Sequence, residues 1–394
     1  MLLRDKKIVL GVCGAISAYK ALELTRLFVK EGAEVYPVMT KGAEEFVTAL
    51  SLAALAGNEV YSEIFELTGA HRISHIELAQ KSDLILIAPA TANFIGKVAS
   101  GIADDLLTTI VCASGVPVLI APSMNTKMWE NPIVAGNVEK LLKHGYHLTG
   151  PYEGDLACGY AGKGRLAHVP DILEAAKEAL SQKDLKGEKV LVSAGPTREA
   201  IDPVRFVSNA SSGRMGYAIA RAARRRGAEV VLVSGPSYLA PPSGVTFVKV
   251  TSAEEMLDAC VRYYTQSTIV VMSAAVADYK PVKSSPTKVK KEAKTLTVEM
   301  ERTQDVLKFM GKGKKDQFLV GFALETENLE DNARKKLREK NLDLVVANSP
   351  WGLDSDYNEV TIINRENETE KLPQLTKAEI ADRILDNVIK LKGM

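Results

Sequence analysis

Short apolar runs without polar interruption recur along the chain, and stretches with the spacing of amphipathic helices separate them. The first run, Lys7–Val12, leads into a helical pattern over Ser17–Lys30, and Gly32 ends that helix. A strand that is apolar on both sides must be covered on both faces, which is typical of parallel sheets flanked by helices. We therefore predict an α/β protein with doubly wound sheets. The predicted strands are 7–12, 34–39, 83–88, 117–121, 189–194, 229–234, 268–274, 318–323 and 342–347.

The alternation of strands and helices is interrupted once, near the middle of the chain. A helical run from about Ala175 ends in the short polar segment Ser181–Gly187, and a new strand begins at Lys189. A chain of 394 residues is too long for one ordinary core. We place the domain boundary at this segment and predict domains over residues 1–185 and 186–394.

Charge and cysteine usage exclude several classes of protein. Lys plus Arg number 50 and Asp plus Glu number 49, so the balance favours neither nucleic-acid binding nor a membrane surface. The four cysteines are far apart and form no CxxC or metal-ligand pattern, which fits a reducing compartment. The chain contains no apolar run of about 18 residues and opens without the pattern of a signal peptide. We expect a cytoplasmic protein that holds no zinc.

Three loops in the first half follow predicted strands and carry ligand-type residues. Gly11–Ser17 joins a strand to a helix, where glycines admit a ligand and the helix N-terminus favours an anion. Pro89–Asn93 offers Thr and Asn, and Ala121–Trp129 places Asn125 beside methionines and a tryptophan. Each loop alone is also compatible with an ordinary turn or a core corner. Ligands of open α/β sheets gather at the carboxyl ends of the strands, so together the loops indicate a pocket.

Two further features of the first half carry reactive side chains. His71 and His75 are four residues apart and share a face if they lie on a helix, although a solvated face is the ordinary explanation. Cys158 lies in Gly154–Arg165, a segment so rich in glycine that it predicts a mobile loop. Structural cysteines are usually buried and inert, so a cysteine on such a loop favours a functional role.

In the second half, polar groups again follow the predicted strands. Ser208–Gly216 combines hydroxyls, glycines and Arg214 ahead of a helix, which suits a phosphate better than it suits a solvated cap. Asp278 ends the strongest strand and is followed by the lysine-rich segment Lys283–Thr303, for which we predict a protruding hairpin or flexible arm. An acid beside lysines suits Mg²⁺ and a triphosphate, although for Asp278 alone a surface salt bridge is the first explanation.

In combination, these motifs resemble those of a known family. The N-terminal half resembles the flavin-containing cysteine decarboxylases. End to end, the chain is similar to the bifunctional phosphopantothenoylcysteine decarboxylase/phosphopantothenate–cysteine ligases of coenzyme A biosynthesis. The matching segments, in order, are Gly11–Ser17, His75, Pro89–Asn93, Pro122–Trp129 and Leu156–Gly159. The resemblance implies a flavodoxin-like first domain and a Rossmann-like second domain with a parallel sheet.

For the first domain, the resemblance implies an FMN-dependent decarboxylase that makes 4'-phosphopantetheine. Flavin oxidises the substrate thiol to a thioaldehyde, CO2 leaves, and the reduced flavin returns the electrons. In this scheme His75 transfers a proton, Asn125 holds the departing carboxylate, and Cys158 is the acid that completes the reduction. The residues implied to bind FMN are Gly14, Ser17, Thr40, Thr91 and Asn93, with the phosphate near Ser17.

For the second domain, the resemblance implies a ligase that activates 4'-phosphopantothenate with CTP as an acyl-cytidylate, which the cysteine amine then attacks. Asn209 contacts the acyl intermediate, Lys288 neutralises phosphate charge in the transition state, and Asp278 is the candidate Mg²⁺ ligand. Gln304 stands where the family has proline, so the choice between CTP and ATP stays open. The residues implied to bind the nucleotide are Asp278, Lys288, Thr303, Gln304, Asp305, Val306, Phe322, Lys336 and Lys340.

The resemblance also implies an assembly in which decarboxylase trimers and ligase dimers build a homo-oligomer such as a dodecamer, with flavin sites shared between subunits. Its partners are then the small-molecule substrates alone, without nucleic acid or membrane. Two alternatives stay open. One is a different flavin decarboxylase or a flavin prenyltransferase whose second domain only binds a ligand, and the other is a catalytically silent flavin-binding regulator. His75 and Cys158 argue against the silent regulator.

Overall fold

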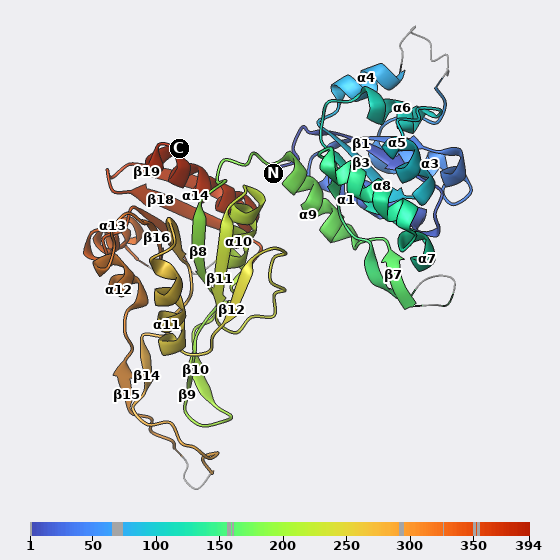
Figure 1. Cartoon of the computed structure of the whole chain (residues 1–394). Helices are drawn as coiled ribbons and strands as arrows, with labels where there is room; N and C mark the ends of the chain where they lie inside the picture. The colour runs from blue at the N-terminus through green and yellow to red at the C-terminus, as the bar shows by residue number, and fades with distance from the viewer. Residues whose placement is uncertain are drawn as a thin grey trace. The chain divides into compact units, whose positions relative to one another are not determined.

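A computed structural model describes residues 2–64, 74–155, 159, 161–290, 295–325, 327–349, 352 and 355–394. The chain forms two compact units, Met1–Ser181 and Gln182–Met394 (Figure 1). Across the described residues, no helix is both long enough and apolar enough to cross a membrane.

The first unit is built on a five-stranded parallel sheet with the strand order β2-β1-β3-β4-β5. This is the order of flavodoxin-like folds, and it confirms the fold expected for the first domain. The direction of strand addition reverses between β1 and β3, so the loops that follow these strands diverge there and leave a crevice. The strands are β1 (Lys7–Val12), β2 (Glu34–Met39), β3 (Leu84–Ala90), β4 (Val118–Pro122) and β5 (His147–Leu148).

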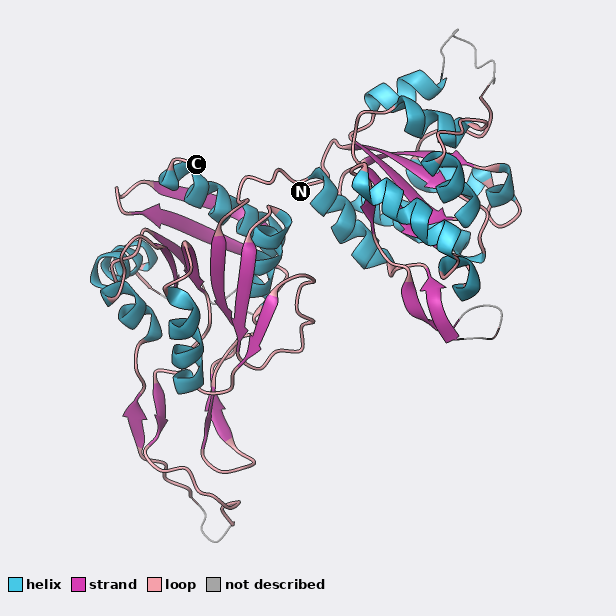
Figure 2. Ribbon diagram, in the orientation of Figure 1, coloured by secondary structure: helices cyan, strands magenta, loops and turns pink. Residues whose placement is uncertain are grey.

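Helices cover both faces of this sheet, as Figure 2 shows. Within β1, Ile8 and Leu10 pack into one core with α1 and α9, whereas Val9 packs into the other core with α5, α6 and α8. This alternation is the reason that the strand is apolar at every position. The helices are η1 (Ile16–Tyr19), α1 (Lys20–Lys30), α2 (Lys41–Glu44), α3 (Ala49–Ala56), α4 (Ser74–Lys81), α5 (Ala92–Ala99), α6 (Leu106–Ala113), α7 (Thr126–Trp129), α8 (Pro132–Lys143) and α9 (Val169–Leu180).

The second unit contains an eight-stranded sheet with the order β12-β11-β8-β13-β16-β17-β18-β19. The first six of these strands pair in parallel in the Rossmann order, with the reversal between β8 and β13. This confirms the Rossmann-like expectation. The strands are β8 (Lys189–Ala194), β11 (Glu229–Ser234), β12 (Thr246–Lys249), β13 (Ile269–Met272), β16 (Phe318–Leu324), β17 (Leu344–Asn348), β18 (Tyr357–Asn364) and β19 (Thr369–Thr376).

The sheet of the second unit is mixed, however, because β18 and β19 add to it in antiparallel orientation. The parallel sheet expected from the sequence therefore covers the first six strands and does not include this edge. Exposed positions interrupt both strands, so neither forms the continuous apolar run that marked the other strands. Helix α14 (Lys377–Lys392) follows β19 directly and begins with a capping box between Thr376 and Glu379.

Two cores again lie on the two faces of the larger sheet. One core contains residues of α10 (Arg214–Arg225) and α14, and the other contains residues of α11 (Ala253–Tyr264), α12 (Val306–Lys312) and α13 (Leu329–Glu339). Valines of β8 pack into the first core and Leu191 into the second. The carboxyl ends of the parallel strands therefore share one open edge, which is where the predicted ligand residues fall.

Three small antiparallel hairpins project from the two sheets. In the first unit, β6 (Tyr152–Asp155) pairs with β7 (Ala161–Arg165). In the second, β9 (Arg198–Ala200) pairs with β10 (Phe206–Ser208), and β14 (Tyr279–Pro281) pairs with β15 (Met300–Arg302). A hairpin is thus present where the sequence predicted one, and its two strands flank the lysine-rich segment. Residues 291–294 lie outside the described part of the chain.

Candidate functional site

In the first unit, two adjoining cavities open at the carboxyl ends of β1–β4, at the crevice between β1 and β3. Their volumes are about 720 Å³ and about 700 Å³, which is the size range of cofactor and substrate pockets. Gly14, Thr91 and Met128 line both of them. The structure therefore brings together the loops that the sequence marked separately.

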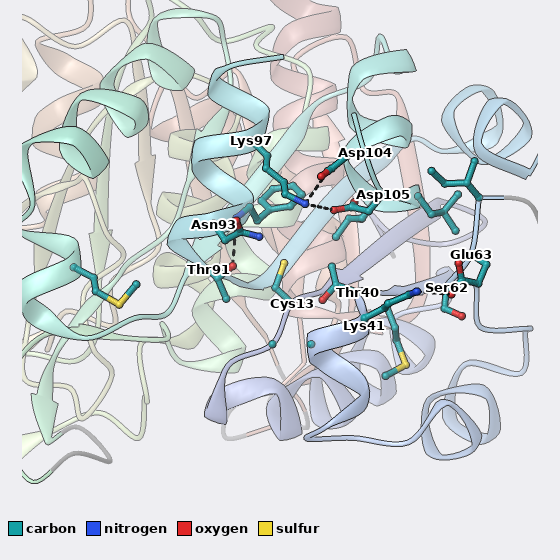
Figure 3. Close-up of a pocket in the computed structure, with 18 residues that line it drawn as sticks. Cys13, Thr40, Lys41, Ser62, Glu63, Thr91, Asn93, Lys97, Asp104 and Asp105 are labelled. Atoms are coloured by element: carbon teal, nitrogen blue, oxygen red, sulfur yellow. Dashed lines mark hydrogen bonds and ion pairs between the residues drawn. The ribbon is translucent and has the colours of Figure 1, made fainter. Parts of the chain in front are cut away.

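The first cavity holds most of the polar residues implied for a flavin, as Figure 3 shows for Thr40, Thr91 and Asn93. Thr91 caps α5, since its hydroxyl accepts a hydrogen bond from the backbone N of Phe94 at 3.3 Å. The side chain of Thr40 donates to the carbonyl of Val12 over 3.4 Å. The cavity thus lies at the N-terminal end of α5, where the peptide dipoles favour an anion.

An ion-pair cluster on the wall of the first cavity was not anticipated from the sequence. The Lys97 ammonium lies 2.7 Å from a carboxylate oxygen of Asp104 and 3.0 Å from one of Asp105. The hydrogen bond that Lys97 donates to Asp104 raises the pKa of Lys97, although burial opposes this shift. Asp105 also caps α6, which binds the cluster to the helix. The only signal of this cluster in the sequence was a pair of acidic residues ahead of an apolar helix, and the same pattern is typical of an ordinary helix N-cap.

Gly14, which has no side chain, lies where the two cavities adjoin. Gly14 approaches the loop after β2 so closely that a Cβ there would lie 2.6 Å from the carbonyl oxygen of Gly42. The neighbouring Cys13 is buried, which raises its pKa to about 12 and keeps it a neutral thiol. Cys13 therefore contributes shape to the cavity and no nucleophile.

The second cavity is bounded by Ser17 and Asn125, together with charged residues that the sequence did not single out. The buried hydroxyl of Ser17 donates to that of Ser123 at 2.7 Å. Lys20 and Arg165 both line the cavity, and burial followed by the charge of Arg165 lowers the pKa of Lys20. Two cations on one wall suit a ligand with phosphate or carboxylate groups. No short motif marks them, because they come from α1 and β7, far apart in the sequence.

The β6–β7 hairpin is seated closely on the loop that carries Asn125. The backbone N of Met124 donates to the carbonyl oxygen of Gly164 at 3.0 Å, and a Cβ at Gly164 would lie 2.2 Å from the Met124 oxygen. Asn125 caps α7, with its side-chain oxygen 2.8 Å from the backbone N of Lys127. Cys158 belongs to the segment between β6 and β7 and lies outside the described residues, as does His71.

His75 lies on α4 and is not among the described residues that line either cavity. Its Nδ1 atom is buried without a hydrogen-bond partner in the described structure. A buried polar atom in this condition usually finds its partner in a ligand, a water molecule or another chain.

These residues fit a flavin mononucleotide. The paired cavities have room for a planar ring and a phosphate chain, and hydroxyl and amide groups line them at a helix N-terminus. Gly14 allows a flat ring to approach the backbone.

The second unit has a corresponding constellation at the reversal between β8 and β13. Helix α10 begins at Gly213, which has a φ of +81° and lies against Gly195 at the end of β8. Gly216 packs on β8, since a Cβ there would lie 2.5 Å from that of Ala194. This close approach brings the helix N-terminus to the sheet edge, as in dinucleotide-binding folds. The Ser208–Gly216 segment is therefore placed to hold a phosphate.

Asn209 ties this segment to the neighbouring strand end. Its amide donates to the carbonyls of Ala275 and Val276 at 3.2 and 3.0 Å. Beside it, Ser208 donates to the carbonyl of Thr197 at 2.7 Å. Asp278 follows the same strand end and is exposed. The structure thus brings Asn209 and the loop that ends in Asp278 to one place.

The segment Thr303–Val306 lies beside Asp278. The backbone N of Thr303 donates to the Asp278 carbonyl at 2.9 Å, and Asp305 caps α12 while accepting from Lys340 at 2.7 Å. Burial opposes ionisation of Asp305, but Lys340 and the helix end lower its pKa overall. Gln304 is exposed, whereas the Val306 side chain is part of the core. Only the backbone of Val306 is therefore available to a nucleotide.

Lys336, Phe322 and Lys288 complete the predicted nucleotide residues. Burial, followed by the charge of Lys340, lowers the pKa of Lys336, while Glu325, Asp305 and Asp278 partly compensate. Phe322 is half-buried at the carboxyl end of β16. Lys288 is exposed on the segment that leaves β14. Glu325 was not anticipated, because it has no motif of its own.

Within the described ranges, no three His, Cys, Asp or Glu side chains gather as a metal site would require. Asp278 therefore belongs to no such cluster among these residues. Magnesium bound with a triphosphate commonly uses one or two protein carboxylates together with phosphate oxygens and water. The structure is consistent with Mg²⁺ arriving with a nucleotide.

Comparison with known proteins agrees with this two-part geometry. A family model described as "Flavoprotein" matches residues 2–181, and one described as "DNA/pantothenate metabolism flavoprotein C-terminal domain" matches residues 185–391. The coenzyme A biosynthesis bifunctional protein CoaBC of Bacillus subtilis (strain 168) is 46% identical over 398 residues, covering 99% of this chain and 98% of the relative. The chain belongs to the family of bifunctional coenzyme A biosynthesis proteins.

Other members of the family are similar along almost their whole length. The corresponding protein of Vibrio cholerae serotype O1 (strain ATCC 39315 / El Tor Inaba N16961) is 42% identical over 390 residues, with coverage of 97% and 98%. Among solved structures, the C-terminal domain of a coenzyme A biosynthesis bifunctional protein CoaBC is 46% identical, covering 54% of this chain and 100% of that one, with a TM-score of 0.48.

Proposed function

We propose that this chain carries out two consecutive steps of coenzyme A biosynthesis. The second unit joins cysteine to 4'-phosphopantothenate at the expense of CTP, and the first unit decarboxylates the resulting phosphopantothenoylcysteine to 4'-phosphopantetheine. The observation that supports the proposal most is that, in a chain similar to its relatives over almost their whole length, each unit has its candidate ligand-binding residues at its own strand-order reversal.

In the first unit, FMN would occupy the paired cavities, held by Gly14, Ser17, Thr40, Thr91 and Asn93. When bound, the flavin supplies the reversible two-electron oxidation that makes loss of CO2 possible. The N-terminal end of α5 would favour the phosphate, since Thr91 caps this helix and Thr40 and Asn93 line the same cavity. This differs from the Ser17 position expected from the sequence.

The chain's own residues then supply orientation and protons. Asn125 is on the wall of the second cavity, where its amide can hold a carboxylate. Lys20 and Arg165 on the same wall would attract the anionic substrate. Cys158, on the segment between β6 and β7, would give the final proton.

We also infer a homo-oligomer in which His75 serves a neighbouring subunit. Two observations support this: the unpartnered Nδ1 atom, and the absence of His75 from the described lining of the chain's own cavities. A trimer of first units and a dimer of second units, building a dodecamer, would meet this requirement. Sedimentation with and without FMN measures the oligomer directly. The wide spacing of the cysteines, with Cys13, Cys112 and Cys260 free among the described residues, further supports a cytoplasmic enzyme.

In the second unit, the α10 N-terminus would bind phosphate, and Asp278, Lys336 and Lys340 would surround the nucleotide with Mg²⁺. Activation is needed because a carboxylate is a poor electrophile. Transfer of a cytidylyl group from CTP releases pyrophosphate and leaves an acyl-cytidylate. The cysteine amine then attacks the acyl carbon, CMP leaves, and the amide remains. Asn209 would position the acyl group, and Lys288 would neutralise developing phosphate charge.

Two assays test the proposal separately. Pyrophosphate release with 4'-phosphopantothenate and each nucleoside triphosphate in turn reports the ligase and settles CTP against ATP. Release of CO2 from phosphopantothenoylcysteine by FMN-loaded protein reports the decarboxylase. Protein that takes up no FMN and releases no CO2 would refute the first activity, and protein that releases no pyrophosphate with any nucleotide would refute the second.

A further inference from the structure

A buried carboxylate in the second unit ties together two segments that carry proposed ligase residues. Asp202 lies in the loop between β9 and β10, and its side chain is 0% exposed. One carboxylate oxygen accepts from the backbone N atoms of Val204 and Arg205, both at 2.8 Å. The other accepts from Arg205 Nη1 at 2.9 Å and from the backbone N of Val289 at 3.2 Å.

Three of these bonds are local, whereas the bond to Val289 spans 87 residues of sequence. Arg205 Nη1 also donates to the Val289 carbonyl oxygen at 3.1 Å, so both backbone polar groups of Val289 are engaged. Burial acts to raise the pKa of Asp202, but the backbone donors and Arg205 lower it overall, which keeps the carboxylate ionised. A buried charge retained with full hydrogen bonding usually specifies a geometry.

The segment held in this way belongs to the lysine arm, the name we give to residues Lys283–Lys290. The β14–β15 hairpin ends where the backbone N of Val282 donates to the Glu299 carbonyl at 3.0 Å. Beyond it, the arm is attached at Ser285, whose backbone N donates to the carbonyl of Ile201 at 2.9 Å, and again at Val289. Lys288 lies between these two attachments, with its side chain exposed.

The other end of the β9–β10 hairpin carries Asn209, which follows β10 directly. Asn209 is hydrogen-bonded to the strand end that leads to Asp278. One hairpin therefore connects the proposed acyl-binding residue at its base to the lysine arm at its tip. A flexible lysine that must meet a triphosphate loses less conformational freedom when its backbone is already held.

We propose that Asp202 is a positioning residue for ligation: by accepting the hydrogen bond from Val289, it holds the lysine arm where Lys288 reaches the triphosphate. This inference depends on the proposed ligase function and adds a residue to it. Asp202 does not itself touch the substrate. It acts through the arm, together with Arg205.

The sharpest perturbation is Asp202→Asn. The amide oxygen can keep the two local bonds to Val204 and Arg205, while the amide nitrogen would face the donors of Arg205 and Val289. The local turn is thereby retained and the long-range bond is lost. The matched control is Asp184→Asn, which also breaks an Asp–Arg pair, with Arg226 at 2.7 Å, away from the proposed site.

The experiment combines hydrogen exchange with a double-mutant cycle on the full-length protein. We expect peptides covering residues 283–290 to exchange faster in Asp202→Asn than in wild type or Asp184→Asn. We expect pyrophosphate release with 4'-phosphopantothenate and CTP to fall roughly 10²-fold, the effect of displacing a reacting group by about 1 Å. In the double variant with Lys288→Gln, no further loss should follow, because both changes remove the same contact.

Losses that multiply in the double variant, or a wild-type rate despite faster exchange of the arm, would overturn the inference. If Asp202→Asn does not fold, Val289→Pro removes the same hydrogen-bond donor from the half-buried partner and should give the same loss. A wild-type rate in Val289→Pro would also overturn the inference. Wild-type protein without nucleotide-dependent pyrophosphate release would refute the ligase itself, while hydrogen exchange still reports on the Asp202 bond.

Discussion

Replacing Gly164 by alanine should impair decarboxylation by displacing the β6–β7 hairpin. A Cβ at this position would lie 2.2 Å from the Met124 carbonyl oxygen, and contacts below 3.0 Å are essentially absent from proteins. The two segments must therefore separate by most of an ångström. The hydrogen bond from the Met124 backbone N to the Gly164 carbonyl, now 3.0 Å, would lengthen, at a cost of about 1 kcal/mol.

The kinetic effect should be larger than the effect on stability. The hairpin carries Arg165 on the wall of the second cavity, and the loop it contacts carries Asn125. A displacement of about 1 Å in such a site costs about 10²-fold in rate. The assay is CO2 release from phosphopantothenoylcysteine, and FMN absorbance checks that the variant still contains its cofactor.

Gly136→Ala is the matched control, because this glycine lies within α8 and a Cβ there meets nothing within 4 Å. Alanine in a helix interior is about 0.5–1 kcal/mol more stable than glycine, so the control should retain full activity and melt slightly higher. A wild-type rate of CO2 release by Gly164→Ala would refute the reasoning, because the steric conflict would then have no consequence for the site.

Four further predictions concern single side chains. Cys158→Ser should let CO2 leave but stop before 4'-phosphopantetheine, and mass spectrometry of the products would contradict the role if the yield stayed normal. Asn209→Asp should abolish amide formation and spare CO2 release; loss of both would mean that the units are not independent. Burial lowers the pKa of Lys336, so this side chain loses its charge at a lower pH than an ordinary lysine does. As the pH is raised, the KM for CTP should therefore begin to increase at a lower pH in the wild type than in Lys336→Arg. Thr91→Ala removes the α5 cap, which should cost about 1 kcal/mol of stability and weaken FMN binding measured by fluorescence titration.

The sequence located most of the structural elements because their signals are local. The predicted strands 7–12, 34–39, 189–194 and 229–234 agree residue for residue with β1, β2, β8 and β11. Continuous apolar runs mark such strands, since helices cover both faces of the sheet. The antiparallel pair β18 and β19 escaped this signal, because exposed positions interrupt both strands.

The candidate sites were predictable as loops but not as assemblies of contacts. Gly14, Thr91 and Asn125 could be named because each follows an apolar run. Lys97 and Arg165 could not, since nothing in their local sequence distinguishes them from other surface charges. Val306 shows the opposite case, in which a residue named from a motif has its side chain in the core.

By itself, the sequence determined the alternation of strands and helices, the division near residue 181 to 188, and which loops carry ligand-type residues, because these depend on residues adjacent in the chain. Only the tertiary structure decided the strand order, which places the reversals between β1 and β3 and between β8 and β13. It alone joined Asp202 to Val289 and Gly164 to Met124. Such contacts depend on how distant segments pack, and no local pattern of residues encodes that.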